Sequence, residues 1–102
     1  MPDIASVIAH AIANKLQVVA TYDGYVREMC PHVLGYKSGR RQALFFQFAG
    51  GSKRGLPPGG EWRCIPIDGL SNVTTRQGPW YTGQSHTKPQ TCVDQIEIEV
   101  AY

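Results

Sequence analysis

The change from a helical to a strand-like pattern at residue 17 is the feature of this sequence that most constrains its fold. Between residues 3 and 16, apolar side chains recur every three or four positions, which is the spacing of an amphipathic helix. The run QVVATY that follows is rich in β-branched residues, and Asp23-Gly24 is a strong signal for a two-residue hairpin turn before YVREMC. The sequence therefore predicts a helix over 3–16, then a hairpin with strands at 17–22 and 25–30. The apolar stripe of the helix consists of Ile4, Val7, Ile8, Ala11, Ile12 and Leu16.

Further strands are expected at 42–48, 61–67, 70–75 and 96–100, separated by a glycine- and proline-rich loop at 49–60 and a long loop at 76–90. Pro31 should end the second hairpin strand, and Pro66 should either place its strand at a sheet edge or bend the strand there, because proline has no N–H to donate to a neighbouring strand. In the last strand, alternation predicts that Ile96, Ile98 and Val100 point inward.

One helix and about six short strands predict an α+β fold, with the helix packed on a small, strongly bent antiparallel sheet or SH3-like partial barrel. A chain of 102 residues is expected to form a single domain over 1–102. No apolar run approaches the roughly 20 residues that span a bilayer, and the N-terminus lacks the pattern of a signal peptide, so we expect a cytoplasmic protein without membrane contact. Three widely spaced cysteines, Cys30, Cys64 and Cys92, predict reduced thiols and no structural disulfide.

The order of motifs resembles that of the WYL domain, an SH3-like β-barrel module of bacterial transcription regulators and defence-associated proteins. The resemblance covers about residues 5–73 and rests on the helix, on VVATY, on Arg27-x-Met29-x-Pro31 and on WRCIPIDGLSNV at 62–73. Tyr22, Arg27, Pro31 and Arg63 match the family pattern by position, whereas Gln42-Ala43-Leu44 stands where the family tripeptide is expected and Gly69 stands where an arginine is expected. The resemblance implies a stand-alone, divergent ligand-binding module that regulates and does not catalyse, and that binds nucleic acid or another anionic ligand.

The basic residues suggest where such a ligand would bind. Lys37, Arg40, Arg41, Lys53 and Arg54 follow one another without an acidic residue between them. We expect Arg27 to face a polar concavity with Arg63, with His32 at its rim and Cys30 packed inward, because neighbouring positions of a strand alternate between faces. Guanidinium groups bind phosphate and carboxylate oxygens with paired donors. The candidate ligand-binding residues are Arg27, His32, Gln47, Lys53, Arg54 and Arg63; the alternative is that Arg27 pairs with Glu28 or Asp68 and that Arg63 covers apolar surface.

Other chemistries have weaker support in the sequence. The cysteines and histidines match no familiar zinc spacing, no signature pairs a cysteine with a histidine base, and GGSKRG lacks the ending of a phosphate-binding loop, so we expect no enzyme activity, metal or cofactor. Trp80 and Tyr81, flanked by glycine and proline, are candidates for an exposed aromatic surface. Two hypotheses follow: a regulatory or accessory module that binds an anionic ligand such as a nucleotide or single-stranded nucleic acid, or a structural module that forms a homo-oligomer or binds a partner protein.

Overall fold

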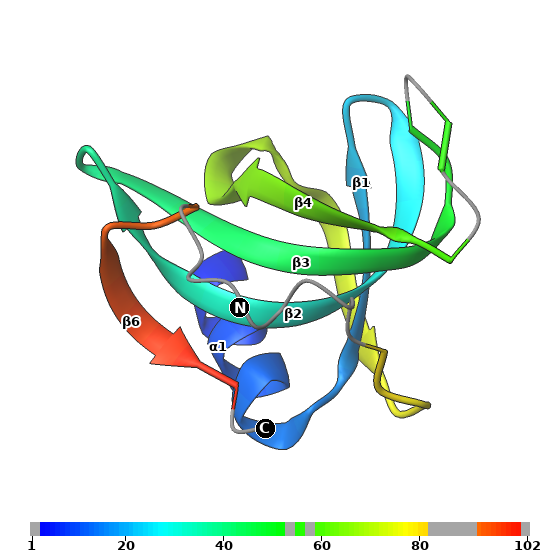
Figure 1. Cartoon of the computed structure of the whole chain (residues 1–102), viewed down its shortest axis with the longest axis horizontal. Coiled ribbons are helices and arrows are strands. Elements are labelled where there is room, and N and C mark those ends of the chain that lie inside the picture. The colour runs from blue at the N-terminus through cyan, green and yellow to red at the C-terminus, as the bar shows by residue number, and fades with distance from the viewer. Residues whose placement is uncertain (1–2, 53–54, 57–58, 82–91, 101–102) are drawn as a thin grey trace.

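The computed structural model describes residues 3–52, 55–56, 59–81 and 92–100, and it consists of one helix and a six-stranded antiparallel sheet (Figure 1). The strands lie in the order β4-β3-β2-β1-β5, and β6 pairs with β2 outside this path. An α+β arrangement on a bent antiparallel sheet is therefore confirmed, but the sheet does not close into a barrel. The elements are α1 (Ile4–Asn14), β1 (Gln17–Tyr22), β2 (Tyr25–Lys37), β3 (Arg40–Gly50), β4 (Glu61–Pro66), the short 3-10 helix η1 (Ile67–Gly69), β5 (Ser71–Arg76) and β6 (Gln95–Glu99).

Local signals position the helix and the two hairpin turns. The Asp3 carboxylate accepts a hydrogen bond from the Ser6 N–H (2.7 Å) and so caps the start of α1. Asp23 and Gly24 both have positive φ, as the tight turn between β1 and β2 requires, and Ser38 and Gly39 repeat this geometry between β2 and β3. The predicted hairpin is thus confirmed, because the residues that specify it lie within the turn itself.

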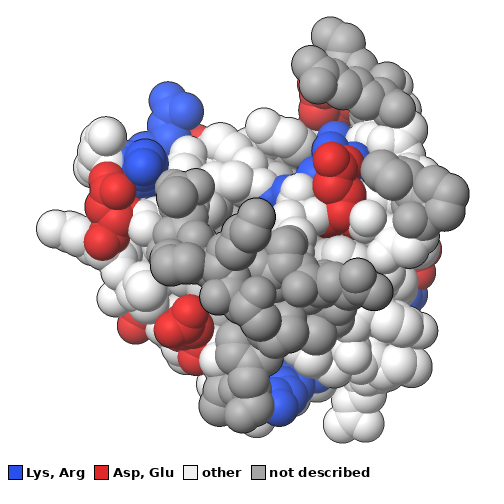
Figure 2. Space-filling view, in the orientation of Figure 1, with Lys and Arg blue, Asp and Glu red and all other residues white. Residues whose placement is uncertain are grey.

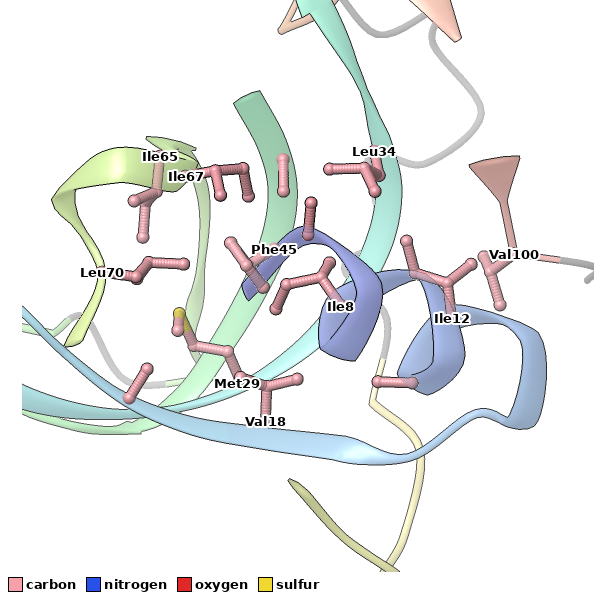
Figure 3. Packing of buried hydrophobic residues seen from close by; sticks show 14 residues of the cluster. Ile8, Ile12, Val18, Met29, Leu34, Phe45, Ile65, Ile67, Leu70 and Val100 are labelled. Atoms are coloured by element: carbon pink, nitrogen blue, oxygen red, sulfur yellow. The ribbon is translucent and has the colours of Figure 1, made fainter. Parts of the chain in front are cut away.

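The main core lies between α1 and the inner, concave face of the sheet. Ile8 and Ile12 of the helix point toward Phe45 and Leu34 of the sheet, and all four side chains are almost fully buried (Figure 3). Val18, Met29, Ile65, Ile67, Leu70 and Val100 complete the labelled cluster. In Figure 1 the helix lies at one end of the curved sheet, and the β1–β2 turn lies at the other end with the chain that follows β3.

Pro31 does not end β2, contrary to the sequence prediction. β2 continues through it for 13 residues, with a register shift between Pro31 and Val33. On its other side, β2 pairs with β1 as far as Met29 and with β6 from Val33 onward. Pro31 therefore lies where β2 changes partner, so its missing N–H interrupts neither ladder. Of the two outcomes expected for Pro66, the edge position is confirmed, because among the described strands β4 pairs with β3 alone.

A second layer covers the outer face of the sheet, and here the prediction of three reduced cysteines is wrong. Cys64 on β4 and Cys92 form a disulfide with their Cα atoms 5.6 Å apart, while Cys30 is a buried thiol. Val93, next to the disulfide, packs with Val33 and Leu44 in a small apolar cluster on the same side. The spacing of 28 residues between the two cysteines hides this pairing, because only the return of the chain across the sheet brings them together.

In β6, one side chain, Ile96, does not point inward as the sequence predicts. Ile98 and Val100 contact the main core, but Ile96 is 51% exposed. A register shift against β2, between Leu34 and Gly35, displaces Ile96 from the inward alternation.

Among the residues placed in the structure, no helix is long and apolar enough to cross a membrane.

Candidate anion-binding site

Arg27 lies on the inner face of β2, at the end of the sheet away from the helix. Met29, two residues further along, belongs to the main core, so Arg27 points into the same concave side. Its residue surface is only 4% exposed. A guanidinium buried to this extent loses hydration, and this loss must be offset by partners.

The partners of Arg27 are neutral. Its Nε donates to the Tyr22 carbonyl oxygen (3.3 Å), its Nη1 donates to Gln47 Oε1 (3.4 Å), and its guanidinium carbon lies 5.0 Å from the centre of the Tyr22 ring. Gly69 leaves room for that ring, since a Cβ at residue 69 would lie 2.7 Å from it. Within the described part of the chain, no carboxylate forms an ion pair with Arg27. The alternative pairing with Glu28 is wrong, because Glu28 binds Arg76.

Gln47 and Ser52 connect this arginine to the chain that follows β3. Gln47 is fully buried, and its Nε2 donates to the carbonyl oxygens of Ala49 (3.1 Å) and Gly51 (3.0 Å). The Ser52 hydroxyl donates to the Gly55 carbonyl oxygen (2.7 Å). Gln47 therefore orients Arg27 with one end of its amide and fixes the start of the loop with the other.

Arg63 on β4 lies on the same inner face. Its Nη2 donates to Ser52 Oγ (3.1 Å) and to the Gly55 carbonyl oxygen (3.4 Å), and it forms an ion pair with Glu61 (3.0 Å). Burial, and then the positive charge of Arg63, lower the pKa of Arg27, with Asp23 exerting a smaller opposite effect. The two guanidinium groups are thus close enough to repel one another. Arg27, Gln47, Ser52 and Arg63 are hereafter called the arginine cluster.

His32 does not lie at the rim of this cluster, as the sequence had predicted. Its residue surface is 0% exposed, and its ring lies on the outer face, 4.7 Å from the Trp62 ring centre and 5.1 Å from that of Trp80. Its Nδ1 is 2.8 Å from the Cys30 carbonyl oxygen. The register shift after Pro31 and the cover from residue 80 enclose the ring. Lys53 and Arg54, also predicted as ligand-binding residues, lie outside the described residues.

Cys30 and the two predicted surface aromatics occupy the outer layer. Cys30 is buried as expected, but opposite the main core, and its Sγ accepts a hydrogen bond from the Tyr81 N–H (3.3 Å). Burial raises the pKa of the Cys30 thiol, which disfavours a nucleophilic thiolate. Trp80 is half-buried against His32, whereas Tyr81 is 42% exposed and its ring centre lies 4.6 Å from that of Phe48. The predicted aromatic surface is therefore reduced to Tyr81.

Two basic residues of the β2–β3 hairpin, Lys37 and Arg41, are matched by carboxylates near the end of the chain. Lys37 pairs with Asp94 (3.2 Å), and Arg41 makes two hydrogen bonds through Nη2 and one through Nε to Glu97. The acidic residues that stand apart in the sequence thus neutralise the basic ones. Figure 2 agrees: on the face it shows, blue and red surfaces are interspersed and do not form one broad basic area.

A hollow of about 800 Å³ lies away from the arginine cluster, between the start of α1 and the β2–β3 turn. Its lining includes the carboxylates Asp3 and Asp68 and the guanidinium groups Arg40 and Arg41. Because this lining carries both negative and positive side chains, it favours neither an anion nor a cation. Within the described ranges, no group of three or more histidine, cysteine or acidic side chains is arranged to hold a metal ion.

Sequence reasoning identified three members of the arginine cluster but missed Ser52. A serine in a glycine-rich stretch carries no signal of its own, and its role depends on Arg63 reaching across from β4.

Comparison with known proteins gave no match to a family model, to a curated protein or to a solved structure.

Proposed function

We propose that this chain is a non-catalytic regulatory or accessory module that binds an anionic ligand, such as a nucleotide or nucleic acid, at the arginine cluster. The proposal includes its assignment as a divergent WYL-like, SH3-like module. One observation carries it: Arg27 is almost completely buried beside a second guanidinium and has no carboxylate partner among the described residues. A buried charge without a counter-charge is costly, and a bound anion would supply what is missing.

The charge pattern elsewhere supports this location. Lys37, Arg41 and Arg76 each have a carboxylate partner, so a ligand would have to compete with that partner. Arg27 has only neutral partners, through two long hydrogen bonds. Its guanidinium can therefore accept an anion without breaking an existing ion pair.

Fluorescence anisotropy with a labelled nucleotide and with labelled single-stranded DNA and RNA tests the proposal. Replacing Arg27 or Arg63 by glutamine should weaken binding about tenfold or more, since a hydrogen bond to a charged group contributes roughly 1.5–3 kcal/mol. The matched control is Lys37→Gln, which removes one positive charge from an exposed ion pair and should leave the affinity within about twofold. Binding that is equally weak in Lys37→Gln and Arg27→Gln, or no binding of any anionic probe, would contradict the proposal.

A further inference from the structure

We infer, on the basis of the proposed function, that the arginine cluster takes a compact anion, a terminal phosphate group of a small ligand, and not the backbone of a nucleic acid strand. Access to Arg27 is the first reason. At 4% exposure, little of Arg27 is open to a ligand, and a strand of linked phosphodiesters would have to enter the sheet together with its sugars.

The chain around the cluster restricts access further. Gly50 faces Arg27 across the β2–β3 ladder with a φ of +93°, and a Cβ at this glycine would lie 2.8 Å from the Arg27 Cα. The Gly51 N–H then donates to the Val26 carbonyl oxygen (3.0 Å). The start of the loop is therefore held against β2 directly beside Arg27.

The donors left over in the cluster suit a small anion with several acceptors. Arg63 Nε is buried and makes no hydrogen bond to any described residue. The hydrogen bonds of Arg27 use its Nε and Nη1, and its Nη2 makes none within the described part of the structure. A tetrahedral phosphate carries oxygens in several directions, so it can accept from two guanidinium groups at once.

Outside the cluster, the described surface offers few of the features that bind a single strand. Proteins that bind single strands combine a basic groove with aromatic side chains on which successive bases stack. Here Lys37 and Arg41 of the β2–β3 hairpin are paired with carboxylates, and Trp62 and Trp80 pack around His32. Tyr81, 42% exposed, lies on the outer layer with Cys30, opposite the face of Arg27, so Tyr25, 39% exposed and two residues before Arg27 on β2, is a single ring beside the cluster and not a row of stacking positions.

Thermal denaturation with graded probes tests the inference at constant ionic strength. The probes are inorganic phosphate, adenosine, adenosine monophosphate, and one single-stranded oligonucleotide prepared with and without a 5′-phosphate. Phosphate and the monophosphate should raise Tm by about 4–8 °C at roughly five times their Kd. Adenosine and the oligonucleotide without a terminal phosphate should not, and adding the 5′-phosphate should restore the shift.

Two variants make the result specific. Arg27→Gln should abolish the shift, and any stabilisation that remains measures the general salting effect of phosphate. Gln47→Glu places a carboxylate beside Arg27 Nη1 and should also abolish the shift by supplying an internal counter-charge. Because it also removes the Nε2 donor to the Ala49 and Gly51 carbonyl oxygens, its Tm without any probe must first match that of the wild type. If the oligonucleotide without a terminal phosphate binds as tightly as the phosphorylated one, or if adenosine matches its monophosphate, the inference is wrong and the proposed function stands. If no anionic probe binds, both are wrong.

Discussion

The disulfide between Cys64 and Cys92 joins β4 to the layer that covers the outer face of the sheet, so breaking it is a direct test of that layer. Replacing both cysteines by serine removes the covalent link but leaves the neighbouring contacts in place. These include the hydrogen bond from Gln42 Nε2 to the Cys92 carbonyl oxygen (2.9 Å) and the packing of Val93 on Val33. We expect the chain to fold without the disulfide and to be less stable.

The size of the loss follows from the length of chain that the bond closes. For a separation of 28 residues, the loop-closure relation gives about 3.5 kcal/mol at 25 °C. In a domain of this size, such a loss corresponds to a decrease in Tm of roughly 15–25 °C. The loss arises mainly because the unfolded chain gains freedom, so the urea m-value of the variant should not fall.

Urea denaturation of the wild type, with and without a dithiol reductant, and of the double variant measures this difference. Reduction should lower the stability of the wild type to that of the variant and leave the variant unchanged. Thiol titration of the unfolded wild type should find one free thiol before reduction, Cys30, and three after it. Equal stability of the oxidised wild type and the variant, or three thiols without reductant, would refute the reasoning.

Three further predictions concern single residues. Gly35→Ala should destabilise the fold by about 1–3 kcal/mol in urea denaturation, because the new Cβ would collide with the Gln95 carbonyl oxygen. The control is Gly39→Ala, whose Cβ would meet no atom but whose backbone has a positive φ, so its loss of stability measures backbone strain without a collision. Burial raises the pKa of Cys30, so folding stability should fall as the pH rises above the pKa of the unfolded thiol, near 8.5, and Cys30→Ala should remove that part of the slope. Arg27→Gln should change the stability of the ligand-free chain by less than about 1 kcal/mol, whereas a larger loss would identify Arg27 as a structural residue.

The parts of the fold that sequence reasoning predicted correctly are those specified by neighbouring residues. The stripe through Ile8 and Ile12 identifies the helix and its buried side, and Asp23-Gly24 specifies the first hairpin. Pro31 was misinterpreted because the effect of a missing N–H depends on which strand lies beside it. At this position β2 changes partner from β1 to β6, and β6 is contributed by a segment more than 60 residues further along the chain.

The errors in the candidate site have one common source, the outer layer. Alternation along β2 correctly placed Arg27 and Cys30 on opposite faces, but only one face was expected to be covered. Trp80, Tyr81 and Cys92 lie over the other face as well, and the rings of Trp62 and Trp80 pack against His32. No local pattern around His32 indicates this cover, because the residues that provide it lie 30 to 60 positions away in the sequence.

Because both faces of β2 are covered, the absence of an ion pair at Arg27 among the described residues requires an explanation. On a sheet with one open face, an arginine near the turn would be hydrated, and its lack of an ion pair would need no explanation. Here the outer layer takes up one face, and the arginine lies on the concave side beside Arg63. Desolvation and the positive charge of Arg63 act against the charged form of Arg27, whereas its hydrogen bonds to Tyr22 and Gln47, the charge of Asp23 and the ion pair of Arg63 with Glu61 act in the opposite direction. On our proposal, an anion that enters beside Arg27 supplies the missing counter-charge, and the relief of desolvation and repulsion contributes to its binding.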